Sequence, residues 1–317
     1  MNLENKGILV TGASGFLGRV IVERLLKRGA VVVISRSEDY NLERFEDALA
    51  IINRFRPEVV IHSAAFYGGL GINYDRPGEV YFKNMTMGTN IIEASHRGGV
   101  KKFVGIGTGC AYPDGIEIPM NEERDFWSGP LHPSVTQYGG VKKMMQVQCE
   151  AYKKQYGFNG IHLVLTNLYG EWDSYNPDRS HVVPALIRKF VEAKMNKKST
   201  VEIWGTGKPI REFLYVKDAA EGIIRATEFY DDIKPLNIAT GIETRIEELV
   251  IKIQHITGYS GNVVWNNSKP DGQMVKTFDI TKMKEVLKWQ PEINLYDGLK
   301  KTIKWFEENY DEAIKRW

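Results

Sequence analysis

A tyrosine and a lysine four residues apart, Tyr138 and Lys142, are the pair in this chain best suited to proton chemistry. The pattern Tyr-x-x-x-Lys also begins at Tyr230, in a polar stretch, and at Tyr296, in an amphipathic C-terminal segment where such pairs are ordinary helix design. Tyr138 alone follows an apolar segment that ends in a hydroxyl residue, Phe103–Thr108. Its place in the chain therefore distinguishes it from the other two tyrosines.

Thr108, Tyr138 and Lys142 together suit proton transfer to and from an oxygen atom. In a helix the Lys142 ammonium would lie on the same face as the phenol, which favours the phenolate. We therefore expect the pKa of Tyr138 to fall from its usual ~10 toward the working pH. Thr108 could hydrogen-bond the same substrate oxygen. The three residues would form a proton-transfer unit.

A glycine-rich segment, Thr11-Gly-Ala-Ser-Gly-Phe-Leu-Gly18, follows an apolar strand and opens a helix, which is the setting of a dinucleotide-binding loop. Gly12 permits the tight turn, Gly15 lets the backbone approach a pyrophosphate, and Gly18 lets helix and strand pack closely. The N–H groups at the start of the helix would then face the anion.

The end of the second expected strand, Val33-Ile-Ser-Arg36-Ser37, indicates which nicotinamide cofactor is preferred. NAD binders hold the adenosine ribose with an acidic residue at this point, and here Arg36 and two serines stand instead. A guanidinium can pair with the 2′-phosphate of NADP and stack on adenine. NADP is therefore favoured. Asp39 lies close enough to leave NAD open, and Arg36 could also be a plain exposed loop residue.

The first half of the chain alternates short apolar runs with amphipathic helical patterns, which is typical of a parallel sheet with crossover helices. The expected strands are Gly7–Val10, Ala30–Ile34, Val59–His62, Lys102–Ile106 and Gly160–Leu165, and the expected helices are Gly18–Lys27, Leu42–Phe55, Val80–Ser95 and Tyr138–Tyr156. The predicted fold class is α/β, a Rossmann-like doubly wound parallel sheet with a smaller α/β domain. We expect residues 1–170 and about 213–240 to bind the cofactor, and residues 171–212 and about 241–317 to bind the substrate.

Composition indicates a globular enzyme rather than a nucleic-acid or membrane-surface binder. Of 317 residues, 43% are hydrophobic and 26% are charged, and the net charge is +2. The first residues run directly into a strand, which leaves no room for a signal peptide, and no apolar run approaches membrane-spanning length. Two cysteines suit a reducing compartment. We therefore expect a cytoplasmic protein without a nucleic-acid, membrane or metal partner, in which Lys101 and Lys102 are solvated.

Longer motifs link the chain to a known family. They are Ala64–Gly69, Asn84–Ala94, Cys110–Pro113, Thr166–Gly170, Ser180–Leu186, Trp204–Gly207, Arg211–Val216 and Lys269–Gly272. With the glycine loop and the Tyr138/Lys142 pair, they make nearly the whole chain resemble the extended short-chain dehydrogenase/reductases and, among these, the GDP-L-fucose synthase family. The resemblance implies an NADPH-dependent enzyme that epimerises a GDP-4-keto-6-deoxy sugar at C3 and C5 and then transfers hydride to C4.

The resemblance also gives roles to Cys110 as a base and His181 as an acid. A 4-keto sugar has acidified hydrogens at C3 and C5, so epimerisation needs one group to remove a proton and another to return one from the opposite face. The reference pKa of a thiol is ~8.5 and that of an imidazole is ~6.5, so both groups can gain or lose a proton near neutral pH. From local sequence alone, Cys110 would more often be a packed small residue and His181 a cap on the following helix.

Binding residues follow from the same resemblance. Cofactor contacts fall on Gly12, Ser14, Gly15, Phe16, Leu17, Gly18, Arg36, Ala64, Ala65, Lys142, Asn167 and Leu168. Substrate contacts fall on Val182, Leu186, Lys189, Trp204, Arg211 and Lys269. Arg211 is the best candidate to bind the diphosphate, because a guanidinium group can donate hydrogen bonds to two oxygens at once. Related reductases pair the helices that match Val80–Ser95 and Tyr138–Tyr156 across a two-fold axis, so we expect a homodimer through a four-helix bundle.

Departures from the family pattern keep other functions open. Ala13-Ser14 replaces a common His-Arg in the glycine loop, which removes a basic residue near the adenosine phosphate. Gly109 replaces a serine beside the sugar and could enlarge the pocket, so a 4-ketoreductase for a related GDP-deoxyheptose is open. A redox-neutral NAD-dependent nucleotide-sugar 4-epimerase and a non-catalytic NADP-binding sensor are further alternatives. The intact proton-transfer unit argues against the sensor, and Cys110 with His181 argues against the simple epimerase.

Overall fold

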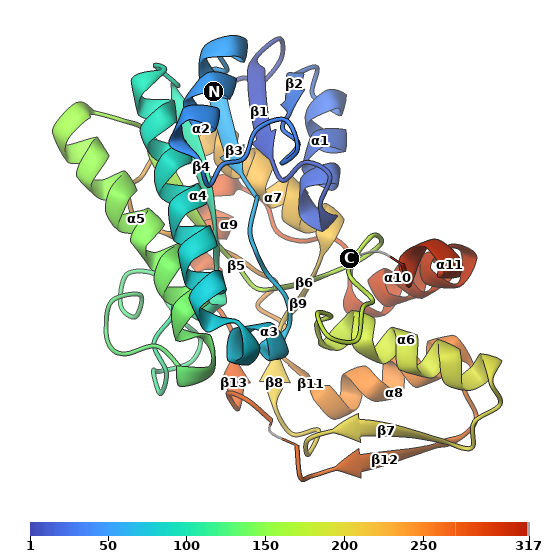
Figure 1. Ribbon diagram of the computed structural model, residues 1–317. Coiled ribbons are helices and arrows are strands. Elements are labelled where there is room, and N and C mark those ends of the chain that lie inside the picture. The colour runs from blue at the N-terminus through green and yellow to red at the C-terminus, as the bar shows by residue number, and fades with distance from the viewer. Residues whose placement is uncertain (270, 316–317) are drawn as a thin grey trace.

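A six-stranded parallel sheet forms the centre of the computed structural model, which describes residues 1–269 and 271–315 (Figure 1). The strand order is β2 (Val31–Ile34), β1 (Gly7–Thr11), β3 (Val59–His62), β4 (Lys102–Thr108), β5 (Gly160–Leu165) and β10 (Leu236–Ile238). Helices cover both faces, which explains why most of these strands read as nearly continuous apolar runs.

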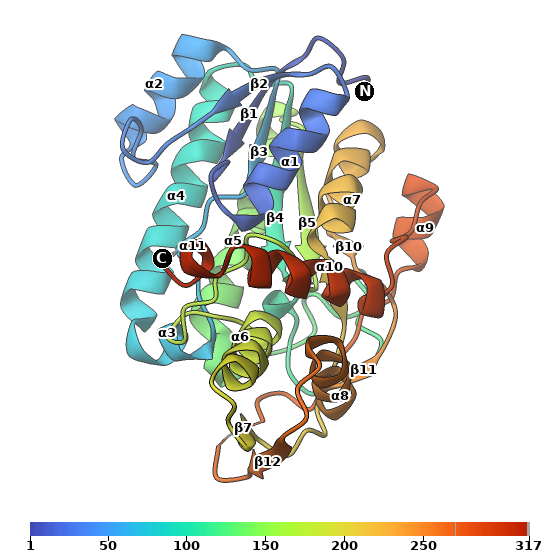
Figure 2. The same cartoon turned by 90° about the vertical axis from the view of Figure 1, so that its right-hand side faces the viewer.

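Two apolar cores separate the sheet from its helices. α1 (Phe16–Lys27) and α7 (Val216–Phe229) cover one face, and α2 (Phe45–Phe55), α4 (Pro77–Arg97) and α5 (Thr136–Tyr156) cover the other (Figure 2). Ile8 and Val10 point into the first core and Leu9 into the second, because successive side chains of a strand face opposite ways. Each such fully buried side chain contributes about 1.5–3 kcal/mol.

A second region lies beyond the carboxyl ends of these strands. Its helices are α6 (Val182–Met195), α8 (Ile246–Thr257) and α10 (Leu295–Glu308), and its small sheets pair β7 (Thr200–Trp204) with β12 (Asn262–Asn266), and β8 (Ile210–Arg211) with β11 (Thr244–Arg245) and β13 (Val275–Lys276). The pair β6 (Asn167–Tyr169) and β9 (Phe213–Tyr215) joins the two regions. The remaining elements are α3 (Leu70–Asp75), α9 (Thr281–Leu287), α11 (Tyr310–Ala313) and the 3₁₀ turns η1 (Gly109–Ala111) and η2 (Pro133–Val135).

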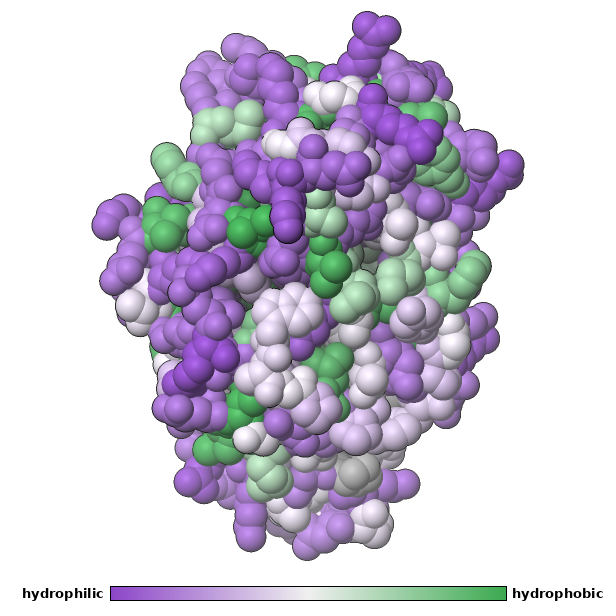
Figure 3. All heavy atoms as spheres, turned by 90° about the vertical axis from the view of Figure 1, so that its left-hand side faces the viewer, coloured by the Kyte–Doolittle hydropathy of each residue, from purple (hydrophilic) through white to green (hydrophobic). Residues whose placement is uncertain are grey.

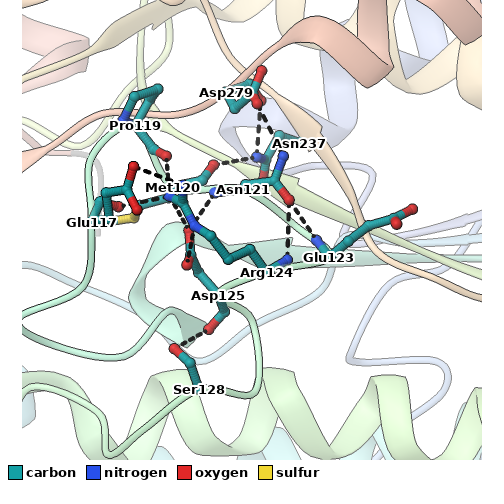
Figure 4. A network of polar contacts seen from close by, with 10 residues as sticks. All are labelled: Glu117, Pro119, Met120, Asn121, Glu123, Arg124, Asp125, Ser128, Asn237 and Asp279. Carbon is teal, nitrogen blue, oxygen red and sulfur yellow. Dashed lines mark hydrogen bonds and ion pairs between the residues drawn. The ribbon is translucent and has the colours of Figure 1, made fainter.

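A polar network ties the long connection between η1 and η2 to the end of the sheet (Figure 4). The side-chain amide of Asn237, on β10, donates to the carbonyl oxygens of Met120 and Asp279, each at 3.0 Å. The Asn121 amide donates to the Asp279 carboxylate, also at 3.0 Å. These bonds hold the chain that follows β13 against the central sheet.

The fold class predicted from the sequence is confirmed, and the five expected strands match β1 to β5 to within a few residues. The sequence did not single out β10 as a sixth strand of the sheet. The domain boundaries stay a prediction; Pro270 and the last two residues, which fall in the expected second domain, lie outside the described residues. Among the described residues no helix is long and apolar enough to cross a membrane, and no cluster of His, Cys, Asp or Glu could hold a metal ion.

Candidate active site

A cavity of about 490 Å³ lies at the carboxyl edge of the parallel sheet. Thr11 at the end of β1 and His62 at the end of β3 share a hydrogen bond of 2.8 Å, which aligns the loops that follow these strands. The predicted residues that line the cavity are Gly12, Ser14, Gly15, Phe16, Leu17, Gly18, Ala64, Ala65, Thr108, Cys110, Tyr138, Lys142, Asn167, Leu168 and His181. A crevice at this edge is where open α/β sheets bind their ligands.

The glycine loop has the shape that a dinucleotide needs. A Cβ at Gly18 would lie 2.1 Å from the carbonyl oxygen of Gly12, so only glycine lets α1 pack this closely on the loop. Gly15, the N-cap of α1, has no side chain to cap the helix, so N–H groups of the first turn remain available to an anion. The residues present therefore fit a pyrophosphate.

The part of the cavity next to the end of β2 is lined by Ser35 and Ser37, the two neighbours of Arg36. Arg36 itself is exposed and is not among the described residues that line the cavity. Its carbonyl oxygen accepts hydrogen bonds from the N–H groups of Asp39 at 3.2 Å and Tyr40 at 3.0 Å, which makes a tight turn. The contact between Arg36 and a 2′-phosphate stays a prediction.

Tyr138 and Lys142 lie one turn apart on α5, and Thr108 ends β4. The Lys142 ammonium lies 5.8 Å from the centroid of the Tyr138 ring. Burial, with a smaller contribution from Cys110, raises the pKa of Tyr138 well above its ordinary value, and burial lowers the pKa of Lys142 to about 8. Our expectation that the pKa of Tyr138 falls is therefore wrong, because desolvation by burial disfavours the phenolate. Tyr138 is a phenol at neutral pH, which suits a proton donor.

Tyr67 connects Tyr138 and His181, and the sequence did not predict this. The centroid of its ring lies 4.6 Å from that of Tyr138 and 4.7 Å from that of His181. The Tyr67 side chain lines the cavity and is 38% exposed, so a ligand can reach it. Tyr67 belongs to the Ala64–Gly69 motif, which was the one available signal, but a motif does not show which rings will stack.

Cys110 and His181 reach the cavity from different elements. Cys110 lies in η1, where its backbone N–H donates to the Thr108 hydroxyl at 3.2 Å. His181 is the N-cap residue of α6, yet its side chain makes no capping hydrogen bond, and its Nε2 is buried without a partner in the part of the chain described. Burial and then the charge of Lys276 lower the pKa of His181 to about 4. His181 therefore occupies the N-cap position, as the alternative expected, but its side chain does not cap the helix.

Sequence reasoning also missed ionisable residues that line the cavity, among them Lys276 and Asp173. The Lys276 Nζ lies 3.3 Å from the Cys110 Sγ. Asp173 Oδ1 accepts a hydrogen bond from the Ser174 N–H at 2.7 Å, whereas Oδ2 is buried without a partner among the described residues, and burial raises the pKa of Asp173 to about 7. Neither residue stands at a recognisable spacing from Cys110, so no local pattern could have found them.

The predicted nucleotide-binding residues lie in the second region, outside the described lining of the cavity. The Trp204 ring is 59% exposed, with the ammonium of Lys269 at 5.0 Å and that of Lys189 at 5.4 Å from its centroid. Arg211 donates to the carbonyl oxygen of Ile210 at 2.8 Å, and burial lowers its pKa. Val182 and Leu186 pack into the core of the second region. An exposed aromatic ring beside two cations suits a base linked to phosphates.

Known proteins resemble this chain in sequence and in fold. Residues 8–239 match the NAD dependent epimerase/dehydratase family. A probable GDP-L-fucose synthase 1 of Oryza sativa subsp. japonica is 37% identical over 99% of this chain and 96% of its own length. A GDP-6-OMe-4-keto-L-xylo-heptose reductase of C. jejuni has a TM-score of 0.90 at 31% identity, covering 96% of this chain and 98% of the other. A GDP-L-fucose synthetase of Naegleria fowleri bound to NADP has a TM-score of 0.88 at 29% identity, covering 98% and 97%.

Proposed function

The chain belongs to the NAD dependent epimerase/dehydratase family and, within it, to the GDP-L-fucose synthases, and from this we propose that it is an NADPH-dependent epimerase and reductase of a GDP-4-keto-6-deoxy sugar. One observation carries the proposal: Cys110 and His181 share a cavity with Thr108, Tyr138 and Lys142. A simple ketoreductase needs only the last three. The first two serve the carbons next to a ketone.

In the proposed epimerisation, the Cys110 thiolate removes a proton from C3 or C5, and the C–H electron pair moves toward the ketone oxygen. The hydroxyl of Thr108 and the phenol of Tyr138 donate to that oxygen and stabilise the enolate. His181 returns a proton from the opposite face. Because its pKa is about 4 in the ligand-free protein, His181 must first be protonated, and the negative charges of the diphosphate and enolate favour the imidazolium.

In the proposed reduction, the glycine loop and the first turn of α1 would hold the cofactor, and Asn167 and Leu168, which line the same cavity, would contact its nicotinamide. NADPH supplies the hydride when it is bound. Tyr138 donates its phenol proton to the C4 oxygen. Lys142, with a pKa of about 8, is mostly charged at pH 7 and stabilises the phenolate that remains.

A 4-ketoreductase for a GDP-heptose is the second candidate, because the C. jejuni reductase has the same fold. We expected Gly109 to enlarge the pocket for such a sugar, and that expectation is wrong. A Cβ at Gly109 would lie 2.3 Å from the Phe278 Cζ, so the Phe278 ring already occupies this space. The position gives no argument for a larger sugar, and Cys110 with His181 favours the epimerase and reductase.

We also propose that α4 and α5 form a homodimer interface. They leave large apolar side chains exposed: Tyr81 and Phe82 on α4, and Met144 and Val147 on α5. Figure 3 views this side of the molecule, where hydrophobic side chains are scattered among hydrophilic ones. Two copies related by a two-fold axis would cover these side chains with their own counterparts. Light scattering at micromolar concentration that gives the mass of one chain would contradict the proposal.

Deuterium exchange tests the proposed activity. In heavy water without reduced cofactor, the protein should introduce deuterium at C3 and C5 of GDP-4-keto-6-deoxymannose, because the enolate forms whether or not hydride follows. Cys110→Ser should suppress the exchange, since a hydroxyl is a far weaker base near neutral pH. Cys149→Ser, the same change at a buried cysteine of α5, should leave it intact. NADPH oxidation with a keto sugar but without exchange would identify a simple 4-ketoreductase.

A further inference from the structure

The ammonium group of Lys276 lies within hydrogen-bond distance of the Cys110 sulfur. Its Nζ lies 3.3 Å from the Sγ, and the side chain is only 9% exposed although it lines the cavity. A buried ammonium so close to a thiol forms a charge-assisted hydrogen bond once the sulfur is ionised. Nothing in the reaction derived above uses this residue.

Gly109 makes room for the lysine. A Cβ at that position would lie 2.9 Å from the Cε of Lys276 and 2.3 Å from the Cζ of Phe278. Any side chain there would push the lysine stem away from the end of β4. The glycine that precedes Cys110 is therefore part of the same arrangement as the lysine.

The backbone around Lys276 is fixed on several sides. Lys276 pairs with Arg211 between β13 and β8. The next residues are also held: the Met120 N–H donates to the Thr277 carbonyl oxygen at 2.8 Å, and the Phe278 N–H donates to the buried Glu212 carboxylate at 2.6 Å. A lysine on such a rigid segment keeps its place when a ligand enters, which is what a supporting residue requires.

The charged and titratable groups that act on Cys110 come from four elements. Lys276 reaches it from β13 and Arg211 from β8, both as cations. Tyr138 of α5 and Tyr67, in the loop after β3, contribute phenols whose pKa values burial raises, so both are neutral near pH 7. Two cations and two neutral phenols favour a negative charge on the sulfur.

We propose that Lys276 is the positioning residue that holds Cys110 as a thiolate, so that the sulfur can act as the base of epimerisation; this rests on the function proposed above. The ammonium keeps its three protons throughout. The sulfur lone pair forms an S–H bond, the C–H bond of the sugar breaks, and its electron pair moves into the enolate. The same charge disfavours a proton on His181, so base and acid begin in the states Cys–S⁻ and neutral imidazole.

Alkylation by iodoacetamide tests the pairing without any sugar. The thiolate attacks the CH₂ carbon and iodide leaves, so the rate follows the thiolate fraction. Mass spectrometry of the Cys110 peptide should show Lys276→Met alkylating about tenfold more slowly than wild type at pH 7, with the rates converging above about pH 9. Lys276→Arg should restore most of the rate, and Gly109→Ala should slow it as Lys276→Met does.

Controls separate this proposal from a general loss of structure. Lys284→Met makes the same change at an exposed lysine of α9 and should leave the rate unchanged. Cys149, which is buried, should stay unmodified in every folded variant. If Lys276→Met does not fold, Lys276→Gln replaces it. Equal alkylation of Cys110 in wild type and the lysine variant from about pH 6 to pH 9 would overturn the proposal. Absence of deuterium exchange in the wild type would instead overturn the proposed function.

Discussion

The cavity holds two groups of proton-handling residues that are assembled in different ways. Thr108, Tyr138 and Lys142 come from β4 and from α5, the helix that packs against this part of the sheet, with the last two one helical turn apart. Cys110, His181 and Lys276 come from η1, the start of α6 and β13, which are far apart in sequence. The first group has a spacing that can be read from the chain. The second exists only once the two regions have packed together.

The electrostatics of the two groups differ as well. In the first, burial dominates, so Tyr138 keeps its proton and the pKa of Lys142 falls to about 8. In the second, a cation contacts the sulfur directly and helps to lower the pKa of His181 to about 4. One cavity thus combines a phenol that retains a proton with a thiol held next to a positive charge. Reduction and epimerisation should therefore be separable by mutation.

The largest expected effect is at Tyr138. Tyr138→Phe removes the proton donor to the C4 oxygen but keeps the ring that stacks on Tyr67. NADPH-dependent reduction should fall by about 10²–10⁴-fold. Deuterium exchange at C3 and C5 should fall much less, because Cys110 and His181 remain and the Thr108 hydroxyl still donates to the enolate oxygen. Parallel loss of both activities would show that the two groups do not work separately.

A smaller effect is expected at His181. His181→Asn removes the group that returns a proton, while Cys110 can still remove one. Inversion at C3 and C5, followed by NMR of the sugar, should fall by about 10²-fold, and exchange into the unchanged isomer should fall less. Equal losses of inversion and exchange would assign both proton transfers to one residue.

The expected effect on cofactor preference is smaller than the effects at Tyr138 and His181. Arg36→Ala removes a guanidinium between Ser35 and Ser37, which line the cavity next to the end of β2. We expect the dissociation constant of NADPH to rise about tenfold while that of NADH barely moves, because only NADPH carries a 2′-phosphate. Titration of the protein with NADPH and with NADH, followed by the fluorescence of the reduced cofactor, gives the two dissociation constants. An equal change for both would make Arg36 a plain loop residue.

The smallest expected effect is on stability at Asp173. Its pKa of about 7 in the folded protein lies above the usual value of an unfolded chain, so the folded state holds a proton that the unfolded state releases. Stability from this group is therefore present at acid pH and lost as the pH rises through about 7. Asp173→Asn should raise the Tm by about 2–4 °C at pH 8 and by less at pH 5. A gain that does not depend on pH would show that Asp173 is not the titrating group.

Local signals in the sequence were enough to predict part of this protein. The alternation of apolar runs and amphipathic helices predicted the parallel sheet, and the glycine spacing predicted the loop that follows β1. Tyr138 and Lys142 could be found because a helix converts a four-residue spacing into one face. Cys110 and His181 were found only through family motifs, since neither has a spacing that indicates chemistry.

The other features could be seen only in the folded chain, because burial and contact depend on segments far apart in the sequence. Lys102 looks like a solvated residue, yet it is 1% exposed, and its ammonium donates to the carbonyl oxygens of Thr227 at 2.6 Å and Tyr230 at 2.7 Å near the end of α7. Desolvation reversed the expected direction of the pKa of Tyr138. Lys276 reached Cys110 across 166 positions of sequence, and no local pattern encodes a contact that two packed regions create.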